Sequence, residues 1–259
     1  MKIILDAMGG DNAPEAVVLG ALDAVKEFDT EIILVGKGEE ILAAMKKNGI
    51  SDLPAGVAIA NADDVVDMHD DPAAVLHKRK NSSMVVGLKM LAEGQGDAFV
   101  SAGSTGALLT AATLVVKRVK GIRRAAMAPA FPNKAGSKTI ICDCGANAEC
   151  TPEFLLQFAY MGSLYMKTQA GIEKPRVALI NNGTEEGKGD TLRHQTSPPV
   201  FSKTHNRKAN HLGATACSSC TSRQSVGGQF FHIDAYRRSE ILELLLCSTK
   251  TLLILIRLE

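Results

Sequence analysis

Aromatic residues are scarce in this sequence, which contains no Trp and only 4% Phe, Trp and Tyr together. Binding platforms for single-stranded nucleic acid depend on exposed aromatic rings on which bases stack, so the sequence disfavours that class of protein. Charge of either sign is not in excess, since 29 Lys and Arg stand against 28 Asp and Glu, for a formal net charge of +1. The composition therefore gives no whole-chain reason to expect a nucleic-acid partner.

A signal peptide and a clear membrane span are also lacking. The first residues enter an apolar run directly after Lys2, without the layout of a secretory signal, so we expect a cytoplasmic protein with reduced cysteines. Residues 241–258 are apolar, but Glu243, Lys250 and Arg257 interrupt them. Each such charge costs roughly 2.5–3.5 kcal/mol at the centre of a bilayer, which disfavours a membrane span.

Candidate metal ligands are few and poorly spaced. Structural zinc sites need four ligands, commonly two C-x-x-C pairs, and two groups here fall short of that pattern: Cys142, Cys144 and Cys150 in one, and His205, His211, Cys217 and Cys220 in the other. His69 lies among aspartates and could act as a ligand or a general base, with a solvated acidic loop as the alternative. The spacing therefore disfavours a structural zinc site in either group.

The sequence is rich instead in short apolar runs that alternate with amphipathic segments. The runs predict strands over residues 3–5, 31–36, 57–60, 97–100, 125–131, 138–142 and 176–180, and the amphipathic segments predict helices over 16–28, 39–48, 83–93, 108–116 and 154–167. Strands and helices that alternate at this spacing are typical of a parallel sheet covered on both faces. The sequence therefore predicts an α/β protein.

The first strand ends in a glycine pair, Gly9 and Gly10, followed by signals that start a helix. Asn12 is suited to an N-cap with Glu15 three residues on, and Pro14 suits the first helical turn. Such a turn leaves N–H groups unpaired at a helix N-terminus, where an anion is favoured. An anion site and an ordinary packing turn are equally good interpretations of this turn by itself.

Three later strands also end in polar or glycine-rich turns. Residues 101–107 offer hydroxyls and two glycines without the order of a dinucleotide fingerprint, residues 143–147 follow the strand at 138–142, and residues 181–189 present Lys188 between glycines without being a P-loop. Ligands of open parallel sheets bind beyond the carboxyl ends of the strands. The turns together therefore favour one shared anion pocket over four packing turns.

Five cations within eight positions follow the second of these turns: Lys117, Arg118, Lys120, Arg123 and Arg124. Such a basic segment could steer an acidic protein or a phosphate to the site. It could equally be an ordinary solvated loop, and the sequence does not decide between the two.

Motifs in several of these turns resemble the bacterial phosphate acyltransferases of the PlsX type. The resemblance lies in residues 6–14 (DAMGGDNAP), 101–107 (SAGSTGA), 145–147 (GAN), 155–159 (LLQFA) and 185–189 (EEGKG), and covers about residues 1–196. Two departures occur: Ser104 stands where the family usually has Asn, and Arg123-Arg124-Ala125 stands where it has Asp-Arg-Pro.

The resemblance implies a three-layer α/β/α fold with a mostly parallel sheet, as in phosphotransacetylase and isocitrate dehydrogenase. It implies transfer of a long-chain acyl group from acyl carrier protein to inorganic phosphate, giving acyl phosphate for phospholipid synthesis, without a cofactor. It also implies a homodimer and allows peripheral membrane association through a C-terminal part of the family that this chain lacks. A phosphate acetyltransferase that uses acyl-CoA and an inactive fragment stay open as alternatives.

Chemistry of this kind assigns roles to residues in the turns. A phosphate dianion would bind at Gly9, Gly10, Ser104 and Thr105, with Asp11, Gly103 and Gly106 in the same two turns. Lys188 would neutralise charge on the phosphate or the oxyanion, and Asn147 is a candidate donor. The basic segment defined above would dock the acidic carrier protein.

The resemblance stops after Thr196, where residues 197–259 turn to Ser, Thr, His and basic residues. The sequence therefore predicts an incomplete family domain over 1–196 and a poorly ordered, non-family tail over 197–259, produced by a frameshift. Resequencing of the gene locus should find the downstream family segment intact in another reading frame. A clean in-frame continuation of the present sequence would refute the frameshift.

Overall fold

A computed structural model describes residues 1–132, 138–181, 190–196, 212–213, 231–235 and 253–256. The chain forms two compact units, one of Met1–Lys117 with Glu240–Glu259 and the other of Arg118–Ser239. Each unit has its own sheet and its own hydrophobic core. Residues 1–196, which the sequence suggested as one domain, therefore divide between the two units.

The sheet of the first unit is mostly parallel. Its strands are β1 (Lys2–Asp6), β2 (Glu31–Gly36), β3 (Val57–Asn61), β4 (Ala98–Ser101) and β10 (Leu253–Ile256), in the order β10-β4-β1-β2-β3. Strands β1 to β4 run parallel, and β10 pairs antiparallel with β4. In the centre of the sheet Leu5 pairs with Leu34 on one side and with Val100 on the other. Strands β1 and β4 are thus direct neighbours that end at the same edge.

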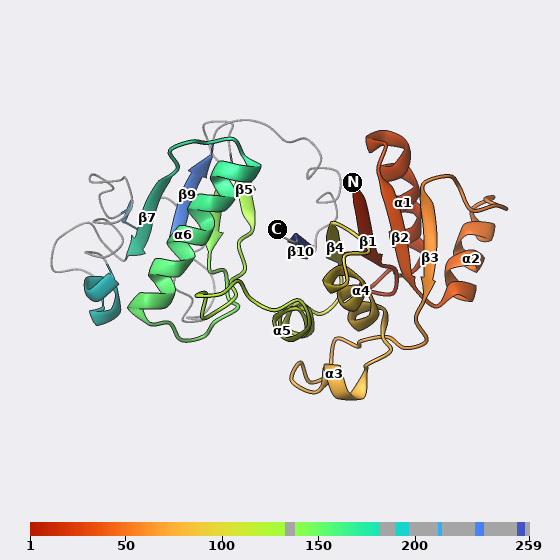
Figure 1. Cartoon of the computed structure of the whole chain (residues 1–259), viewed down its shortest axis with the longest axis horizontal. Coiled ribbons are helices and arrows are strands. Elements are labelled where there is room, and N and C mark those ends of the chain that lie inside the picture. Colours follow the sequence, from red (N-terminus) through yellow and green to blue (C-terminus); the bar gives the residue numbers. More distant parts are fainter. Residues whose placement is uncertain (133–137, 182–189, 197–211, 214–230, 236–252, 257–259) are drawn as a thin grey trace. The chain divides into compact units, whose positions relative to one another are not determined.

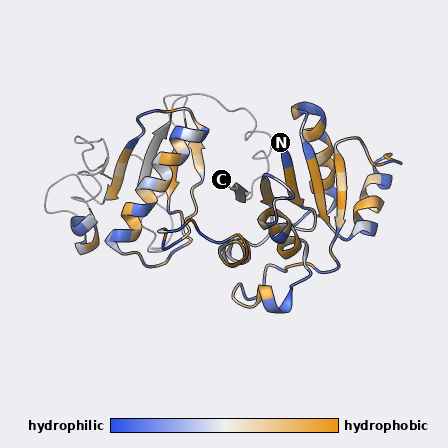
Figure 2. Cartoon of the chain, in the orientation of Figure 1, coloured by the Kyte–Doolittle hydropathy of each residue, from blue (hydrophilic) through white to orange (hydrophobic). Residues whose placement is uncertain are grey.

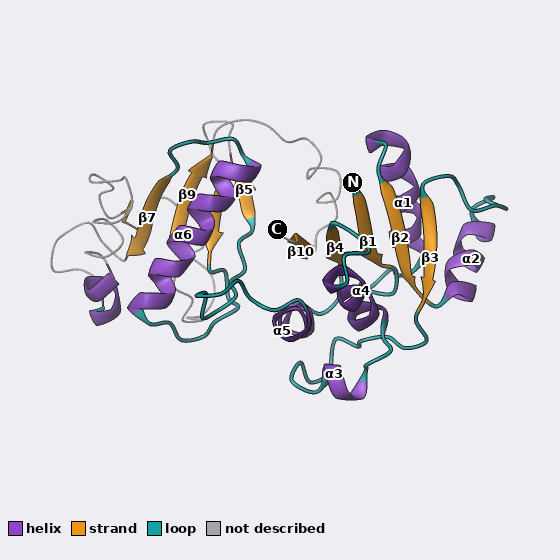
Figure 3. Cartoon of the chain, viewed as in Figure 1, coloured by secondary structure: helices purple, strands orange, loops and turns teal. Residues whose placement is uncertain are grey.

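Helices cover both faces of this sheet, as Figures 1 and 3 show. Successive strand residues point to opposite faces, so Leu5 packs with helices α1 (Glu15–Phe28) and α2 (Gly38–Lys47). Its neighbour Ile4 packs with the helices of the other face, α4 (Ser83–Ala92) and α5 (Thr105–Val115). The short α3 (Val75–Lys78) lies in the polar segment between β3 and α4. The predicted three-layer α/β/α arrangement is confirmed.

The predicted N-cap of α1, Asn12, was wrong, although the helix predicted over 16–28 begins at Glu15. The helix is capped by Pro14, without a hydrogen bond from any capping side chain, and Asn12 contributes its backbone carbonyl, which accepts from the Ala16 N–H at 3.0 Å. The turn that precedes the helix is longer than the pattern indicated, so Asn12 lies before the capping position. Ser104, by contrast, caps α5 with its side chain.

The second unit has a mixed sheet with α6 (Pro152–Gln169) along one face. The strands are β5 (Ala130–Pro132), β6 (Lys138–Cys142), β7 (Arg176–Asn181), β8 (Leu212–Gly213) and β9 (Phe231–Ala235), in the order β5-β6-β9-β7-β8. Strand β9 runs antiparallel to both neighbours, β6 and β7. Phe158 of α6 is fully buried against strand residues such as Ile140 and Leu179, and Figure 2 shows apolar residues interspersed with polar ones along the helix.

Membrane-spanning helices are absent from the part of the chain that the structure describes, where no helix is both long and apolar enough to cross a bilayer. The apolar stretch at residues 241–258 lies largely outside the described residues, apart from β10. Its predicted failure to span a membrane stays a prediction.

Gly87 of α4 allows this helix to lie directly on the sheet of the first unit. A Cβ at this position would overlap the Phe99 ring and come within 3.3 Å of Cγ2 of Ile4. Overpacking a core costs roughly 1–3 kcal/mol, so we expect Gly87→Ala to lower the free energy of unfolding by about that amount. Urea denaturation followed by circular dichroism measures it.

Gly20→Ala is the matched control, because Gly20 is an exposed position of α1 in the same unit and a Cβ there meets nothing within 4 Å. Its better helix propensity should raise the free energy of unfolding by up to about 1 kcal/mol. Effects of the same sign in both variants would contradict the packing described.

Candidate anion-binding site

The first two predicted turns lie side by side at one edge of the sheet of the first unit. They follow β1 and β4, which are adjacent and parallel. A Cβ built on Gly103 would come within 3.4 Å of the Cα of Gly9, so the two backbones are in contact. The structure thus brings together two of the turns that the sequence proposed for a shared pocket.

Asp6, the last residue of β1, joins the two turns. Its side chain is 2% exposed, and its carboxylate oxygens accept from the Ser101 hydroxyl at 2.7 Å and from the Met8 N–H at 3.2 Å. The Ser101 hydroxyl oxygen in turn accepts from the Gly103 N–H at 3.1 Å. A continuous chain of hydrogen bonds therefore runs from one turn to the other. Sequence reasoning gave Asp6 no role, although a carboxylate directly after a buried strand is a usable signal.

Burial raises the pKa of the Asp6 carboxyl above its ordinary value of 3.8, because desolvation disfavours the charged form. Hydrogen bonds from Ser83 and Ser101, and from the backbone of Met8 and Gly9, oppose the shift but do not cancel it. The site therefore rests on a carboxyl group that takes up a proton more readily than an exposed aspartate.

Only glycine fits at the two positions of the first turn. A Cβ on Gly9 would lie 2.7 Å from Oδ2 of Asp6, 2.8 Å from Oγ of Ser101 and 2.9 Å from the Gly103 nitrogen. Gly10 has a φ of +108°, a conformation that side chains rarely adopt. The backbone of the first turn is therefore packed closely against residues 101–103.

The second turn leads into α5, whose N-terminus lies at this edge. Ser104 is 7% exposed, and its oxygen accepts from the Ala107 N–H at 3.4 Å, which leaves its hydroxyl hydrogen to donate. Thr105 is half-buried as the first helical residue, and Gly106 is exposed beside Pro72. Hydroxyl donors at the positive end of a helix dipole suit an oxyanion.

A hollow of about 450 Å³ adjoins the two turns within the first unit. Its lining includes Gly10, Asp11 and Gly103 from the turns, together with Lys37, Arg79 and the acidic segment around residues 63–67. Arg79 bonds Asp64 at 3.0 Å and Asp70 at 2.9 Å, and its hydrogen bond holds the pKa of Asp70 below the ordinary value. Arg79 therefore holds Asp64 and Asp70 in place through two ion pairs.

His69 is exposed on this segment, and its backbone N–H donates to the Asp67 carboxylate at 2.8 Å. In the described ranges, no group of three or more His, Cys, Asp and Glu side chains is placed to hold a metal ion. Burial raises the pKa of the Cys142 thiol to about 12, so it is protonated near neutral pH. The second candidate zinc group, in the tail, lies outside the described residues.

The third predicted turn, in the second unit, is organised by Asp143. Its 2%-exposed carboxylate accepts from the N–H groups of Met127 at 2.7 Å, Asn147 at 2.8 Å and Ala146 at 3.2 Å. The Asn147 side-chain amide donates to Asp143 at 3.1 Å and to the Ala125 carbonyl at 2.9 Å. Both its amide hydrogens are therefore used inside the turn, and donation to a substrate would require breaking one of these bonds.

Only some of the remaining predicted site residues lie in the described part of the chain. Lys188 and most of its loop lie outside the described residues. Lys117 and Lys120 of the basic segment are exposed, Arg123 forms an ion pair with Glu153 at 3.0 Å, and Arg124 lies over the Phe154 ring.

The three-layer α/β/α fold of this chain is shared by two solved phosphotransacetylase structures. A phosphotransacetylase from Streptococcus pyogenes superposes with a TM-score of 0.61 over 82% of this chain and 68% of its own. The EutD phosphotransacetylase from Staphylococcus aureus gives a TM-score of 0.57 over 82% and 67%. Both are 19% identical to this chain, so the likeness concerns the fold.

A protein family described as "Fatty acid synthesis protein" matches residues 1–218, and the chain belongs to this family. A phosphate acyltransferase from Bacillus licheniformis is 42% identical over 214 residues, and one from Desulfitobacterium hafniense is 46% identical over 198. The matches cover 82% and 76% of this chain but only 62% and 58% of those relatives. The predicted family is confirmed, and its match continues past residue 196.

The pKa of Asp6 makes a prediction about stability. A raised pKa means that the folded state holds a proton that the unfolded state has released, so stability falls as the pH rises from 3.8 to the raised value and stays low above it. Asp6→Asn cannot ionise. Relative to the wild type, its free energy of unfolding should therefore rise through this window and then level off.

Glu15→Gln provides a control of opposite sign, since the hydrogen bond from Lys47 lowers the pKa of Glu15. Its stability relative to the wild type should fall as the pH rises towards the ordinary glutamate value of 4.5. Urea denaturation across about pH 3 to 8 measures both differences. A pH-independent difference for Asp6→Asn would contradict the raised pKa.

Proposed function

We propose that this protein transfers an acyl group to inorganic phosphate and releases an acyl phosphate. The observation that carries the proposal is the contact between the turns after β1 and β4, with α5 beginning at Thr105. Together they concentrate N–H and hydroxyl donors at one edge of the sheet. Membership of the family and the names of the relatives, which are phosphate acyltransferases, support the same reaction.

The proposed phosphate site consists of Gly9, Gly10, Ser104 and Thr105. A phosphate oxygen attacks the carbonyl carbon of an acyl thioester, and the carbonyl becomes a tetrahedral oxyanion. Collapse of this intermediate breaks the C–S bond, so the thiolate leaves with the electron pair and takes a proton from solvent. Donors fixed in place before the reaction stabilise the oxyanion without reorganisation.

Lys188 keeps the proposed role of neutralising charge on the phosphate or the oxyanion. For Asn147 we propose a positioning role, because its amide holds Asp143 and the Ala125 carbonyl. In this role Asn147 fixes the turn after β6 and does not itself donate to the oxyanion.

We propose acyl carrier protein as the donor of a long-chain acyl group, with phospholipid synthesis as the pathway served. The exposed cations of the basic segment support this choice, since carrier proteins are acidic. A cytoplasmic homodimer that associates peripherally with membranes is part of the same proposal and rests on the resemblance of the sequence.

The test is an assay of the purified 259-residue chain for phosphate-dependent formation of acyl phosphate from long-chain acyl carrier protein. Thr105→Val removes one hydroxyl from the proposed phosphate site at nearly constant volume. Loss of a hydrogen bond to a charged group costs roughly 1.5–3 kcal/mol, so kcat/KM for phosphate should fall by about 10- to 100-fold.

Thr110→Val is the matched control, because Thr110 is a half-buried residue further along the same helix. It should leave kcat/KM for phosphate within about 2-fold of the wild type. Equal losses in both variants would remove Thr105 from the phosphate site. Turnover of acetyl-CoA in place of acyl carrier protein would favour the phosphate acetyltransferase alternative, and a folded chain without either activity would favour the inactive fragment.

A further inference from the structure

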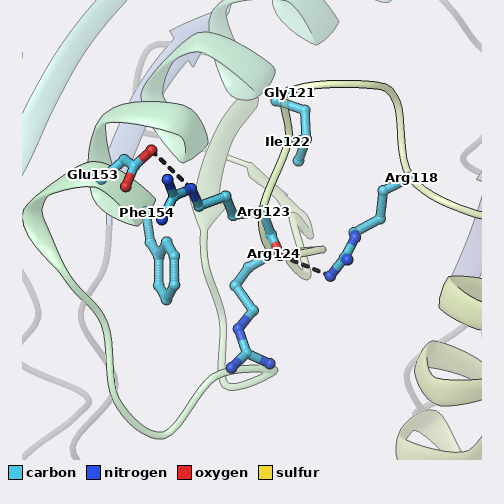
Figure 4. Close-up of a pocket in the computed structure, with 7 residues that line it drawn as sticks. All are labelled: Arg118, Gly121, Ile122, Arg123, Arg124, Glu153 and Phe154. Carbon is cyan, nitrogen blue, oxygen red and sulfur yellow. Dashed lines mark hydrogen bonds and ion pairs between the residues drawn. The ribbon is translucent and has the colours of Figure 1, made fainter.

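A second hollow, of about 710 Å³, lies entirely within the second unit, at the first turn of α6 (Figure 4). The connection at residues 118–124 forms one side of it, and Glu153 and Phe154 of α6 form the other. Three of its lining residues are arginines, Arg118, Arg123 and Arg124. It is therefore a strongly basic concavity that uses none of the residues of the two turns in the first unit.

Hydrogen bonds hold the connection against α6. The Gln157 side chain accepts from the Arg123 N–H at 2.8 Å and donates to the Gly121 carbonyl at 3.1 Å. The Arg118 guanidinium donates to the Arg123 carbonyl at 2.7 Å. Because these contacts exist without a ligand, less ordering is required when one binds.

The three arginines are not equivalent. Arg123 is paired with Glu153 at 3.0 Å, so much of its charge is balanced. Over the residues that the structure describes, Arg118 and Arg124 have no carboxylate within ion-pair distance. Figure 4 shows the Arg118 guanidinium directed at the Arg123 carbonyl, and the Arg124 side chain beside Phe154, with its guanidinium 5.7 Å from the centre of the ring. Two cations without a carboxylate partner among the described residues therefore line the same hollow.

We propose that this hollow binds the phosphate ester group of the acyl donor through Arg118 and Arg124. Arginine presents a planar fork of N–H donors that matches phosphate oxygens, and the N-terminal turn of α6 adds a favourable dipole. The hollow is larger than a phosphate ion requires, and Ile122 and Phe154 offer apolar surface beside the cations. These features fit a phosphate with an organic chain attached.

This inference rests on the proposed function, which supplies the donor. The thioester of an acyl carrier protein is carried on a phosphopantetheine arm whose phosphodiester joins it to the protein. Coenzyme A carries the same arm, with its phosphate in a diphosphate. The hollow would thus recognise the arm itself, which is a more specific role than attraction of an acidic protein surface by the basic segment as a whole.

The experiment compares binding of three probes to the full chain by calorimetry: acyl carrier protein with the arm, the same protein without it, and coenzyme A. The variant is Arg118→Gln/Arg124→Gln, and both positions are exposed, so folding should persist and a thermal melt checks this. Lys174→Gln is the control for loss of surface charge, because Lys174 is an exposed cation outside the hollow of the same unit.

We expect the arginine variant to weaken binding of the arm-bearing carrier protein and of coenzyme A by about 10-fold or more, as loss of charged hydrogen bonds implies. Binding of the carrier protein without the arm should change by less than about 3-fold, and Lys174→Gln should change none of the three by more than that. If the arginine variant binds the carrier protein equally more weakly with and without the arm, the arginines bind an acidic protein surface, and the inference is overturned. Unchanged binding, or no binding of the arm-bearing protein by the wild type, would overturn it outright.

Failure of this inference and failure of the proposed function can be told apart. A wild-type chain that binds the arm through these arginines but forms no acyl phosphate refutes the function alone. A wild-type chain that forms acyl phosphate, together with an arginine variant whose KM for the acyl donor is unchanged, refutes the inference alone.

Discussion

The hydrogen bond between Ser101 and Asp6, at 2.7 Å, is the contact on which the candidate anion site depends. It joins the ends of β1 and β4, and the Ser101 oxygen also receives the Gly103 N–H, so the two glycine turns are held at a fixed separation. The close contacts around Gly9 leave no room for a side chain between them. The N–H groups of Met8 and Gly103 are used in these contacts, which fix the backbone of both turns. A site whose donors are fixed in advance is what an oxyanion requires.

Burial raises the pKa of the Asp6 carboxyl, while hydrogen bonds from Ser83, Ser101 and the backbone oppose the shift. The candidate site of the second unit is built from different groups. Its arginines are exposed and supported by α6, and one of the three is neutralised by Glu153. Exposed cations attract at long range and buried donors bind at short range, so the two features suit different steps of recognition.

Much of the described fold could be predicted from the sequence, because apolar runs and helical periodicity report burial locally. The strands at 31–36 and 138–142 lie where they were expected. The strand expected from residue 125 begins only at Ala130, since the Ala125 carbonyl accepts from Asn147 and Met127 bonds to Asp143. The cap expected at Asn12 was wrong because the turn before α1 is longer than the pattern shows. In each case a contact distant in sequence, or the path of a turn, outweighed the local pattern.

The sequence by itself determined the α/β class, the family and the identity of the glycine turns, because these depend on local patterning and on motifs. Only the tertiary structure decided what the side chains in those turns do. It assigned Asp6 a linking role that no motif indicated, used both amide hydrogens of Asn147 inside its own turn, and distinguished the paired Arg123 from the unpaired Arg118 and Arg124 in the part of the chain described. The physical reason is that a hydrogen bond or an ion pair depends on distances between residues far apart in the chain, such as the 95 positions between Asp6 and Ser101.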